Sequence, residues 1–168
     1  QYLTAVGDTL FFNARGTSGY ELWKSDGTEA GTVMVKEIEP GNNMYNGGAS
    51  YLTAVGDTLY FAADDGIHGL ELWKSDGTEA GTVMVKDLWP GNDSSGSPND
   101  GFKERMTAIG DIVYFAGNDG VNGYGLYKSD GTANGTEFIT SPFTSINSVM
   151  YDLVATGDTL YFQGTSTG

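Results

Sequence analysis

A block of sixteen residues occurs twice without change, at Glu21–Lys36 and again at Glu71–Lys86. A weaker third copy keeps its central part at Leu126–Thr132. Self-similarity with a period of roughly 20–50 residues is typical of solenoids, propellers and arrays, in which each repeat buries its apolar surface against its neighbours. The repeat therefore constrains the fold more than any other feature of the chain.

A second block precedes each copy and consists of a Gly-Asp pair followed by four mostly apolar residues. It occurs at Gly7–Phe12, Gly56–Phe61, Gly110–Phe115 and Gly157–Phe162. A Gly-Asp pair between apolar runs predicts a tight hairpin, because glycine accepts the positive φ that such turns require. Side chains alternate along a strand, and the fifth residue of every block is aromatic, so both faces are apolar. Such a strand suits a sheet that lies between two others, whereas a sheet with one wet face alternates with polar residues.

Each repeat contains four short candidate strands, and no segment has a sustained helical period. Four strands in roughly 40–50 residues match the blade of a β-propeller. We therefore predict an all-β, propeller-like array of four-stranded antiparallel blades, with three full blades and about half of a fourth. The array is a single unit over residues 1–168, with blades near 2–38, 51–88, 105–140 and 150–163. Propellers close with about four to eight blades, so we expect other protein chains or further repeats to complete the ring.

Composition excludes several classes of partner. Eight basic against 22 acidic residues give a formal charge of −14, which repels nucleic-acid phosphates and anionic membrane surfaces. No apolar run approaches the ~20 residues that span a bilayer, so we expect no membrane insertion. The chain has no cysteine, which removes disulfides and thiolate metal sites.

Three aspartates occupy the same place in the Ser-Asp-Gly-Thr segments: Asp26, Asp76 and Asp130. One interpretation is a turn residue whose carboxylate accepts backbone N–H groups, and the other is a ligand for Ca²⁺. Repetition in register favours the structural interpretation, because a metal site needed once need not be copied three times.

Better calcium candidates are Asp64, Asp65 and Asp119, which lie in Asp- and Asn-rich loops after the second strands. Clustered carboxylates and loop carbonyls can supply the six to eight oxygens that Ca²⁺ requires. Their spacing does not match the Asp-x-Asp-x-Asp-Gly pattern of a calcium loop, and the first copy has Asn13-Ala14-Arg15-Gly16 at this place. We therefore interpret these residues as turns and expect no cofactor.

Three tryptophans are candidates for ligand contact. Trp23 and Trp73 share one repeat position with Tyr127, so they are interpreted as packing residues, with sugar stacking as the alternative. Trp89 has no counterpart in the first copy and begins a loop, so it is the strongest candidate. His68 is the only histidine, and no Gly-x-Ser-x-Gly segment accompanies it, so it is interpreted as a loop residue.

The segments between repeats are the most variable parts of the chain. Residues 39–50, 89–103 and 141–148 differ in length and are rich in Gly, Asn, Ser and Pro. They are expected to be exposed loops, and a specific binding surface is expected to be built from them.

The string Glu-Leu-Trp-x-x-Asp-Gly-Thr-x-x-Gly-Thr-x-x-Val resembles the ELWxxDGT repeat of large exported bacterial proteins. Residues 21–35 and 71–85 match it in full, whereas the third copy has Gly125, Tyr127 and Ile139 in place of Glu, Trp and Val. The resemblance covers nearly the whole chain. It implies modular scaffolding on a secreted or cell-surface bacterial protein.

The predicted function follows from regular copying of packing and turn residues without a unique reactive cluster. We expect a non-catalytic, secreted or cell-surface repeat module that acts as a scaffold, an adhesion element or a subunit of an extracellular or outer-membrane complex. One alternative is a carbohydrate-binding, lectin-like propeller with glycan partners. Another is a fragment of a propeller hydrolase.

Overall fold

The computed structural model describes residues 3–16, 19–39, 48–97, 99–141 and 149–165. Within these ranges the chain forms fourteen β-strands and no helix. Accordingly, none of the described segments is a helix that could cross a membrane.

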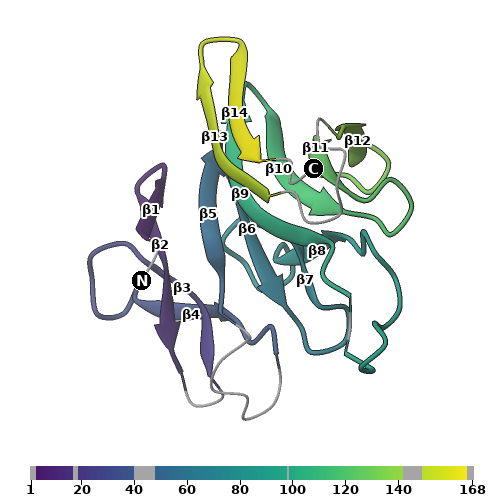
Figure 1. The fold of residues 1–168 in the computed structure, drawn as a ribbon. Coiled ribbons are helices and arrows are strands. Elements are labelled where there is room, and N and C mark those ends of the chain that lie inside the picture. The colour runs from purple at the N-terminus through teal and green to yellow at the C-terminus, as the bar shows by residue number, and fades with distance from the viewer. Residues whose placement is uncertain (1–2, 17–18, 40–47, 98, 142–148, 166–168) are drawn as a thin grey trace.

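The strands form four antiparallel sheets in which neighbours in sequence are neighbours in space (Figure 1). The first sheet contains β1 (Leu3–Val6), β2 (Thr9–Arg15), β3 (Tyr20–Ser25) and β4 (Val33–Lys36). The second contains β5 (Ser50–Val55), β6 (Thr58–Asp64), β7 (Leu70–Ser75) and β8 (Val83–Lys86). The third contains β9 (Phe102–Ile109), β10 (Ile112–Asn118), β11 (Tyr124–Ser129) and β12 (Glu137–Thr140). The fourth is the hairpin of β13 (Val149–Thr156) and β14 (Thr159–Thr165).

Each sheet begins with the hairpin that the Gly-Asp pairs predict. Gly7, Gly56, Gly110 and Gly157 have φ values of +56°, +54°, +56° and +55°. A residue with a side chain rarely adopts this left-handed conformation, which explains why glycine occupies the first turn position each time. The turn fixes the register of the strands, with Val6 opposite Thr9 and Val55 opposite Thr58.

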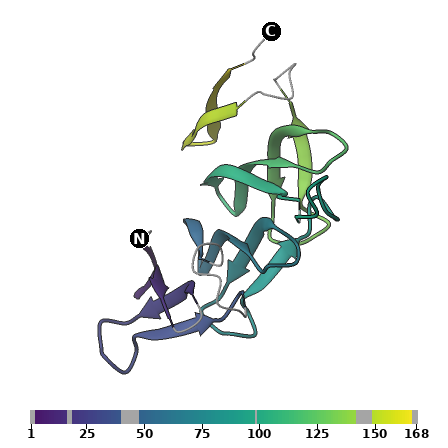
Figure 2. The ribbon, with the colours of Figure 1, turned by 60° about the horizontal axis from the view of Figure 1, so that its bottom comes forward.

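The sheets follow one another along an open arc in chain order (Figure 2). The first strands of successive sheets lie side by side, so β1 contacts β5, β5 contacts β9, and β9 contacts β13. The array is open rather than closed into a ring.

Apolar side chains fill the spaces between consecutive sheets. Tyr60 and Phe61 are neighbours in β6, and they belong to two different cores, on opposite sides of the second sheet. Their exposed fractions are 5% and 0%. The prediction that both faces of the sheets are apolar is therefore confirmed for this sheet.

The predicted all-β class with antiparallel sheets is confirmed, and the strands differ from expectation only in extent. The second strand of each full sheet continues past the apolar block, to Arg15, Asp64 and Asn118. The third sheet begins at Phe102, a few residues before the predicted start, because an irregular pairing lets β9 continue. Residues 40–47 and 142–148, in two of the predicted binding loops, lie outside the described residues.

Candidate functional site

The Ser-Asp-Gly-Thr loops are closed by hydrogen bonds among their own residues. In the second sheet, Asp76 Oδ1 accepts bonds from the Thr78 backbone N–H (2.8 Å) and from Thr78 Oγ1 (2.7 Å). Thr78 Oγ1 accepts the N–H of Gly81 at 2.9 Å, and a Cβ on Gly81 would overlap the Asp76 carboxylate. These bonds hold the pKa of Asp76 below its usual value, with the Thr78 hydroxyl as the main cause.

The same bonds recur in the other copies, where Asp26 bonds to Thr28 and Asp130 bonds to Thr132. A second link joins the ends of the loop, since the hydroxyls of Ser75 and Thr82 lie 2.7 Å apart. Every polar position of the motif thus has a partner within the loop. The aspartates act here as turn residues that accept hydrogen bonds.

Lysines of the repeat connect each sheet to the next one. Lys24 Nζ donates to the carbonyl of Gly77 at 2.7 Å, and Lys74 Nζ donates to the carbonyl of Gly131 at the same distance. Lys36 and Lys86 make a second contact of this kind with the carbonyls of Thr82 and Thr136, each at 3.0 Å. A bond with a charged donor is stronger than a neutral one, so these four inter-sheet lysines help to fix the spacing of the sheets.

Buried glutamates form another connection. Glu71 is fully buried, and its carboxyl oxygens accept the N–H groups of Leu88 at 3.2 Å and Gly101 at 3.0 Å. It thereby ties the end of the second sheet to the entry of the third. Burial raises the pKa of Glu71 to about 8, and it raises the pKa of its counterpart Glu21 to about 7. No role was predicted for these residues from the sequence, although they share the repeat position that Gly125 occupies in the third copy.

The calcium candidates also bond to their own loops. Asp64 Oδ1 accepts the N–H of Gly66 at 2.8 Å, and Asp65 Oδ1 accepts the N–H groups of Ile67 and His68, both at 2.9 Å. Asp119 Oδ1 binds the N–H groups of Val121 and Asn122 in the same way. Among the described residues, no three His, Cys, Asp or Glu side chains gather as a metal site would require.

His68 lies in the loop that joins β6 to β7, and its ring Nδ1 is 2.7 Å from Asp65 Oδ2. Burial acts to raise the pKa of Asp65, but hydrogen bonds from His68 and Ile67 outweigh it and lower the pKa. The pair links two residues three positions apart in one turn, which fits the interpretation of His68 as a loop residue.

The three tryptophans have different surroundings. Trp73 is 6% exposed and its ring lies 6.4 Å from that of Phe61, so it is a core residue rather than an exposed platform for a sugar. Trp23 is half-buried. Trp89 is half-buried as well, and it lies against Gly120 with the Lys103 ammonium 5.6 Å from its ring centre. A role of Trp23 or Trp89 in ligand contact stays a prediction.

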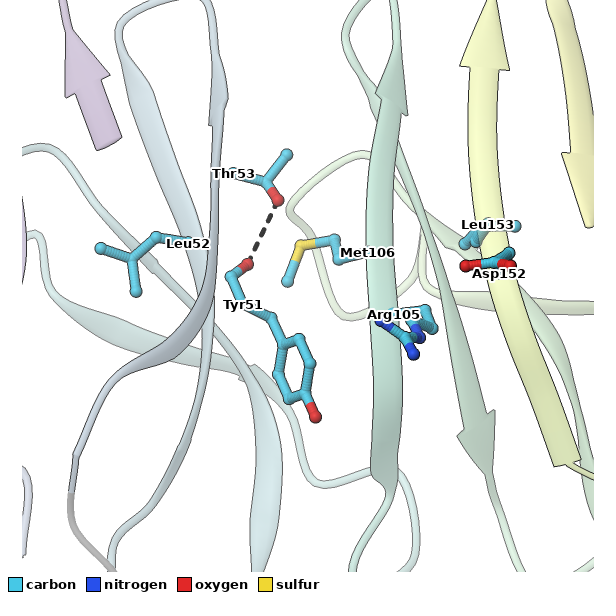
Figure 3. Close-up of a pocket in the computed structure, with 7 residues that line it drawn as sticks. All are labelled: Tyr51, Leu52, Thr53, Arg105, Met106, Asp152 and Leu153. Atoms are coloured by element: carbon cyan, nitrogen blue, oxygen red, sulfur yellow. Dashed lines mark hydrogen bonds between the residues drawn. The ribbon is translucent and has the colours of Figure 1, made fainter. Parts of the chain in front are cut away.

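A pocket of about 220 Å³ lies where the first strands of the second, third and fourth sheets meet (Figure 3). It is lined by Tyr51, Leu52 and Thr53 from β5, by Arg105 and Met106 from β9, and by Asp152 and Leu153 from β13. The lining therefore combines an aromatic residue, a cation and an anion with three apolar residues, Leu52, Met106 and Leu153.

Repeat register explains how these side chains meet. Tyr51, Arg105 and Asp152 each lie five residues before a Gly-Asp pair, so they occupy one position of the repeat on strands that lie side by side. The pairing of β5 and of β9 with its neighbour is irregular at Tyr51 and at Arg105. Both residues have positive φ, 55° and 57°, which is rare for residues with a side chain. Such bulges re-aim side chains and are frequent near functional sites.

This pocket was not predicted from the sequence. A signal was present, since the position is Tyr, Tyr, Arg and Asp in the four copies while the following residues stay Leu or Met. Tyr2, the first-copy equivalent, lies outside the described residues. Chemically, the pocket can hold a small polar molecule by stacking on Tyr51 and by charge-assisted hydrogen bonds to Arg105 and Asp152.

Comparison with known proteins gives a likeness of fold. No family model and no curated protein matches this sequence. Among solved structures, puromycin hydrolase is similar to this chain with a TM-score of 0.56 and 12% identity over 82% of this chain and 20% of that chain. A point mutant of puromycin hydrolase complexed with PGG is similar to this chain with a TM-score of 0.53 and 13% identity. The match covers 77% of this chain and 18% of the mutant's chain. The chain thus spans about a fifth of the length of these structures, and identity this low shows a shared fold alone.

Proposed function

We propose that this chain is a non-catalytic, propeller-like repeat module of a secreted or cell-surface protein, in which the sheets present their loops to other proteins. The observation that carries the proposal is the use of the repeated polar residues. The aspartates, serines and threonines of the loops bond within the loops, and the lysines and buried glutamates bond between elements. These contacts give the repeated polar residues a structural role, which supports a non-catalytic module.

The resemblance of the motif to the ELWxxDGT repeat supports an exported bacterial protein and a scaffold, adhesion or complex-forming role. Fold likeness to a hydrolase is compatible with this proposal, because one fold carries many functions and chemistry depends on particular residues.

Location and catalysis can be tested separately. Intact cells of the source organism are treated with protease and probed with an antibody against the chain. A surface module is degraded while a cytoplasmic control protein survives, and protection of the chain would contradict the proposal.

The purified chain is also assayed with ester and aminoacyl-amide substrates. We expect no turnover above a heat-unfolded sample, and turnover that disappears in Asp152→Asn would favour the hydrolase alternative.

Binding of a small polar ligand such as a carbohydrate is the second candidate function. It is favoured by the pocket of Tyr51, Arg105 and Asp152. A glycan array compares the wild-type chain with Arg105→Ala and Trp89→Ala. If the glycan binds in the pocket, binding is lost in Arg105→Ala and kept in Trp89→Ala. If it binds at the loop that begins with Trp89, binding is lost in Trp89→Ala and kept in Arg105→Ala. If the wild type binds no glycan, the carbohydrate-binding function is rejected and the scaffold role is the remaining candidate.

A further inference from the structure

Every full sheet has two apolar faces with different residues. The leading face, which contacts the next sheet along the chain, carries Phe11 in the first sheet and Tyr60 in the second. The trailing face, which contacts the preceding sheet, carries Leu59 in the second sheet and Val113 in the third. The interior contacts are thus always leading face against trailing face.

The trailing face of the first sheet is uncovered. Leu10 is 39% exposed, whereas its counterparts Leu59 and Val113 are completely buried. Leu3 and Met34 on the same face are 70% and 41% exposed. These residues form an apolar face of the kind that is covered where consecutive sheets meet.

The loop at the edge of this face is already in the conformation of a covered one. The hydroxyls of Ser25 and Thr32 lie 2.7 Å apart, as do those of Ser75 and Thr82, but the first pair is exposed and the second is buried. Phe11 lies over Gly77 and Tyr60 lies over Gly131, while no atom lies within 4 Å of where a Cβ of Gly27 would be. Docking onto the first sheet therefore needs no rearrangement of its loop, which lowers the entropy cost of binding.

The leading face of the fourth sheet is the matching surface. Tyr161 follows the repeat register of Phe11 and Tyr60, yet it is 59% exposed where they are 3% and 5% exposed. Its cross-strand partner Val154 is 57% exposed and points to the same face.

We propose that a second copy of this chain docks head to tail, with the leading face of its β13–β14 hairpin on the trailing face of the first sheet. Tyr161 of one copy then covers Gly27 of the other, in the way that Phe11 covers Gly77 and Tyr60 covers Gly131 within the chain. Docking also buries Leu3 and Leu10 of the first sheet. The contact continues the packing that the chain already uses between its consecutive sheets. It joins two different surfaces, so it builds rings or linear assemblies rather than a symmetric pair. It goes beyond the proposed function and holds whether or not the pocket binds a ligand.

Charge sets a condition on this assembly. Each copy carries −14, so copies repel one another at low ionic strength. Salt screens that repulsion and strengthens burial of apolar surface, so association increases with ionic strength. This dependence is opposite to that of a contact held by salt bridges.

The test is sedimentation equilibrium of the chain from about 1 µM to about 1 mM, at ionic strengths of about 0.05 M and 0.5 M. Variants Leu3→Ser and Tyr161→Ser remove one apolar group from each surface, and Val121→Ser is the control because Val121 is 88% exposed and lies on neither face. We expect the wild type to associate more strongly at high salt. Each surface variant should weaken association at least ~10-fold, and the control should leave it unchanged.

Mixing the two surface variants gives the decisive result. Leu3→Ser keeps an intact hairpin and Tyr161→Ser keeps an intact first sheet, so the mixture forms one wild-type interface and yields heterodimers. Far-UV circular dichroism verifies that each variant is folded.

Three outcomes overturn the proposal: a wild type that stays monomeric to about 1 mM, variants that associate like the wild type, or a mixture that restores nothing. The first would mean that a different protein, or further repeats of a longer polypeptide, covers these faces. The last would indicate a symmetric contact instead of a head-to-tail one.

Discussion

Replacing Glu71 with glutamine should change how stability depends on pH. Burial of the Glu71 carboxyl raises its pKa from 4.5 to about 8 in the folded chain. Below pH 4.5 the folded and unfolded states both hold the proton, so this group contributes no pH dependence. Between pH 4.5 and about 8 only the folded state holds it, so the free energy of unfolding falls as pH rises. Above about pH 8 both states have lost the proton, so the free energy of unfolding no longer depends on this group's titration.

The magnitude follows from the size of the shift. One pKa unit corresponds to about 1.4 kcal/mol, so the group accounts for a loss on the order of 5 kcal/mol between pH 4.5 and about 8. Glu71→Gln removes this titration. It also leaves either Leu88 or Gly101 without an acceptor, because the amide NH₂ cannot accept the bond that a carboxyl oxygen accepts. An unsatisfied buried N–H costs about 1–3 kcal/mol.

Urea unfolding of the wild type and of Glu71→Gln at pH 5, 6, 7 and 8 measures the effect. At pH 5, Glu71→Gln should have a lower free energy of unfolding than the wild type. As the pH rises, the difference between the two free energies should narrow by up to ~1.4 kcal/mol per pH unit, and near pH 8 it should vanish or change sign. Glu29→Gln is the same substitution on an exposed loop and serves as the control for general charge repulsion. A difference between wild type and Glu71→Gln that stays constant over this range, or that matches the control, would refute the reasoning.

Three other predictions concern the repeat. Lys74→Met should lower the free energy of unfolding by about 1–2 kcal/mol in urea titrations because it removes the bond to the third sheet, whereas Lys128→Met, which loses only an exposed ion pair, should cost less than about 0.5 kcal/mol. Equal costs would contradict a special role of the inter-sheet lysines. Gly131→Ala should destabilise by about 2 kcal/mol more than Gly27→Ala, since both have positive φ but only the first meets a tyrosine hydroxyl. Thermal melts that shift equally would disprove this close approach. Millimolar Ca²⁺ should raise Tm no more than Mg²⁺ of equal ionic strength, and a Ca²⁺-only gain abolished by Asp65→Asn would show a metal site.

Strands and hairpins could be predicted from sequence because they depend on neighbours along the chain. The Gly-Asp turns need only a residue that accepts positive φ, and the alternation of apolar residues requires only a pleated strand. The loop of Asp76 and Thr78 is equally local, since its bonds join residues at most a few positions apart. These features were visible without knowledge of the tertiary structure.

The pocket and the inter-sheet contacts could not be predicted in the same way. Lysines in a repeat are usually solvated, and nothing near Lys74 in sequence indicates that its ammonium reaches Gly131. The meeting of Tyr51, Arg105 and Asp152 depends on which strands lie side by side and on irregular pairing that interrupts the alternation of side chains. Both depend on contacts between residues far apart in the chain.

The two identical blocks separate the contributions of sequence and tertiary structure. Glu21–Lys36 and Glu71–Lys86 have the same residues and form the same strands, loop and loop hydrogen bonds, so the sequence by itself determined that local structure. Yet Thr32 is exposed and Thr82 is completely buried. Burial, the strength of inter-sheet bonds and the pKa of a carboxyl depend on what the neighbouring sheet places against a residue, and only the tertiary structure decided those.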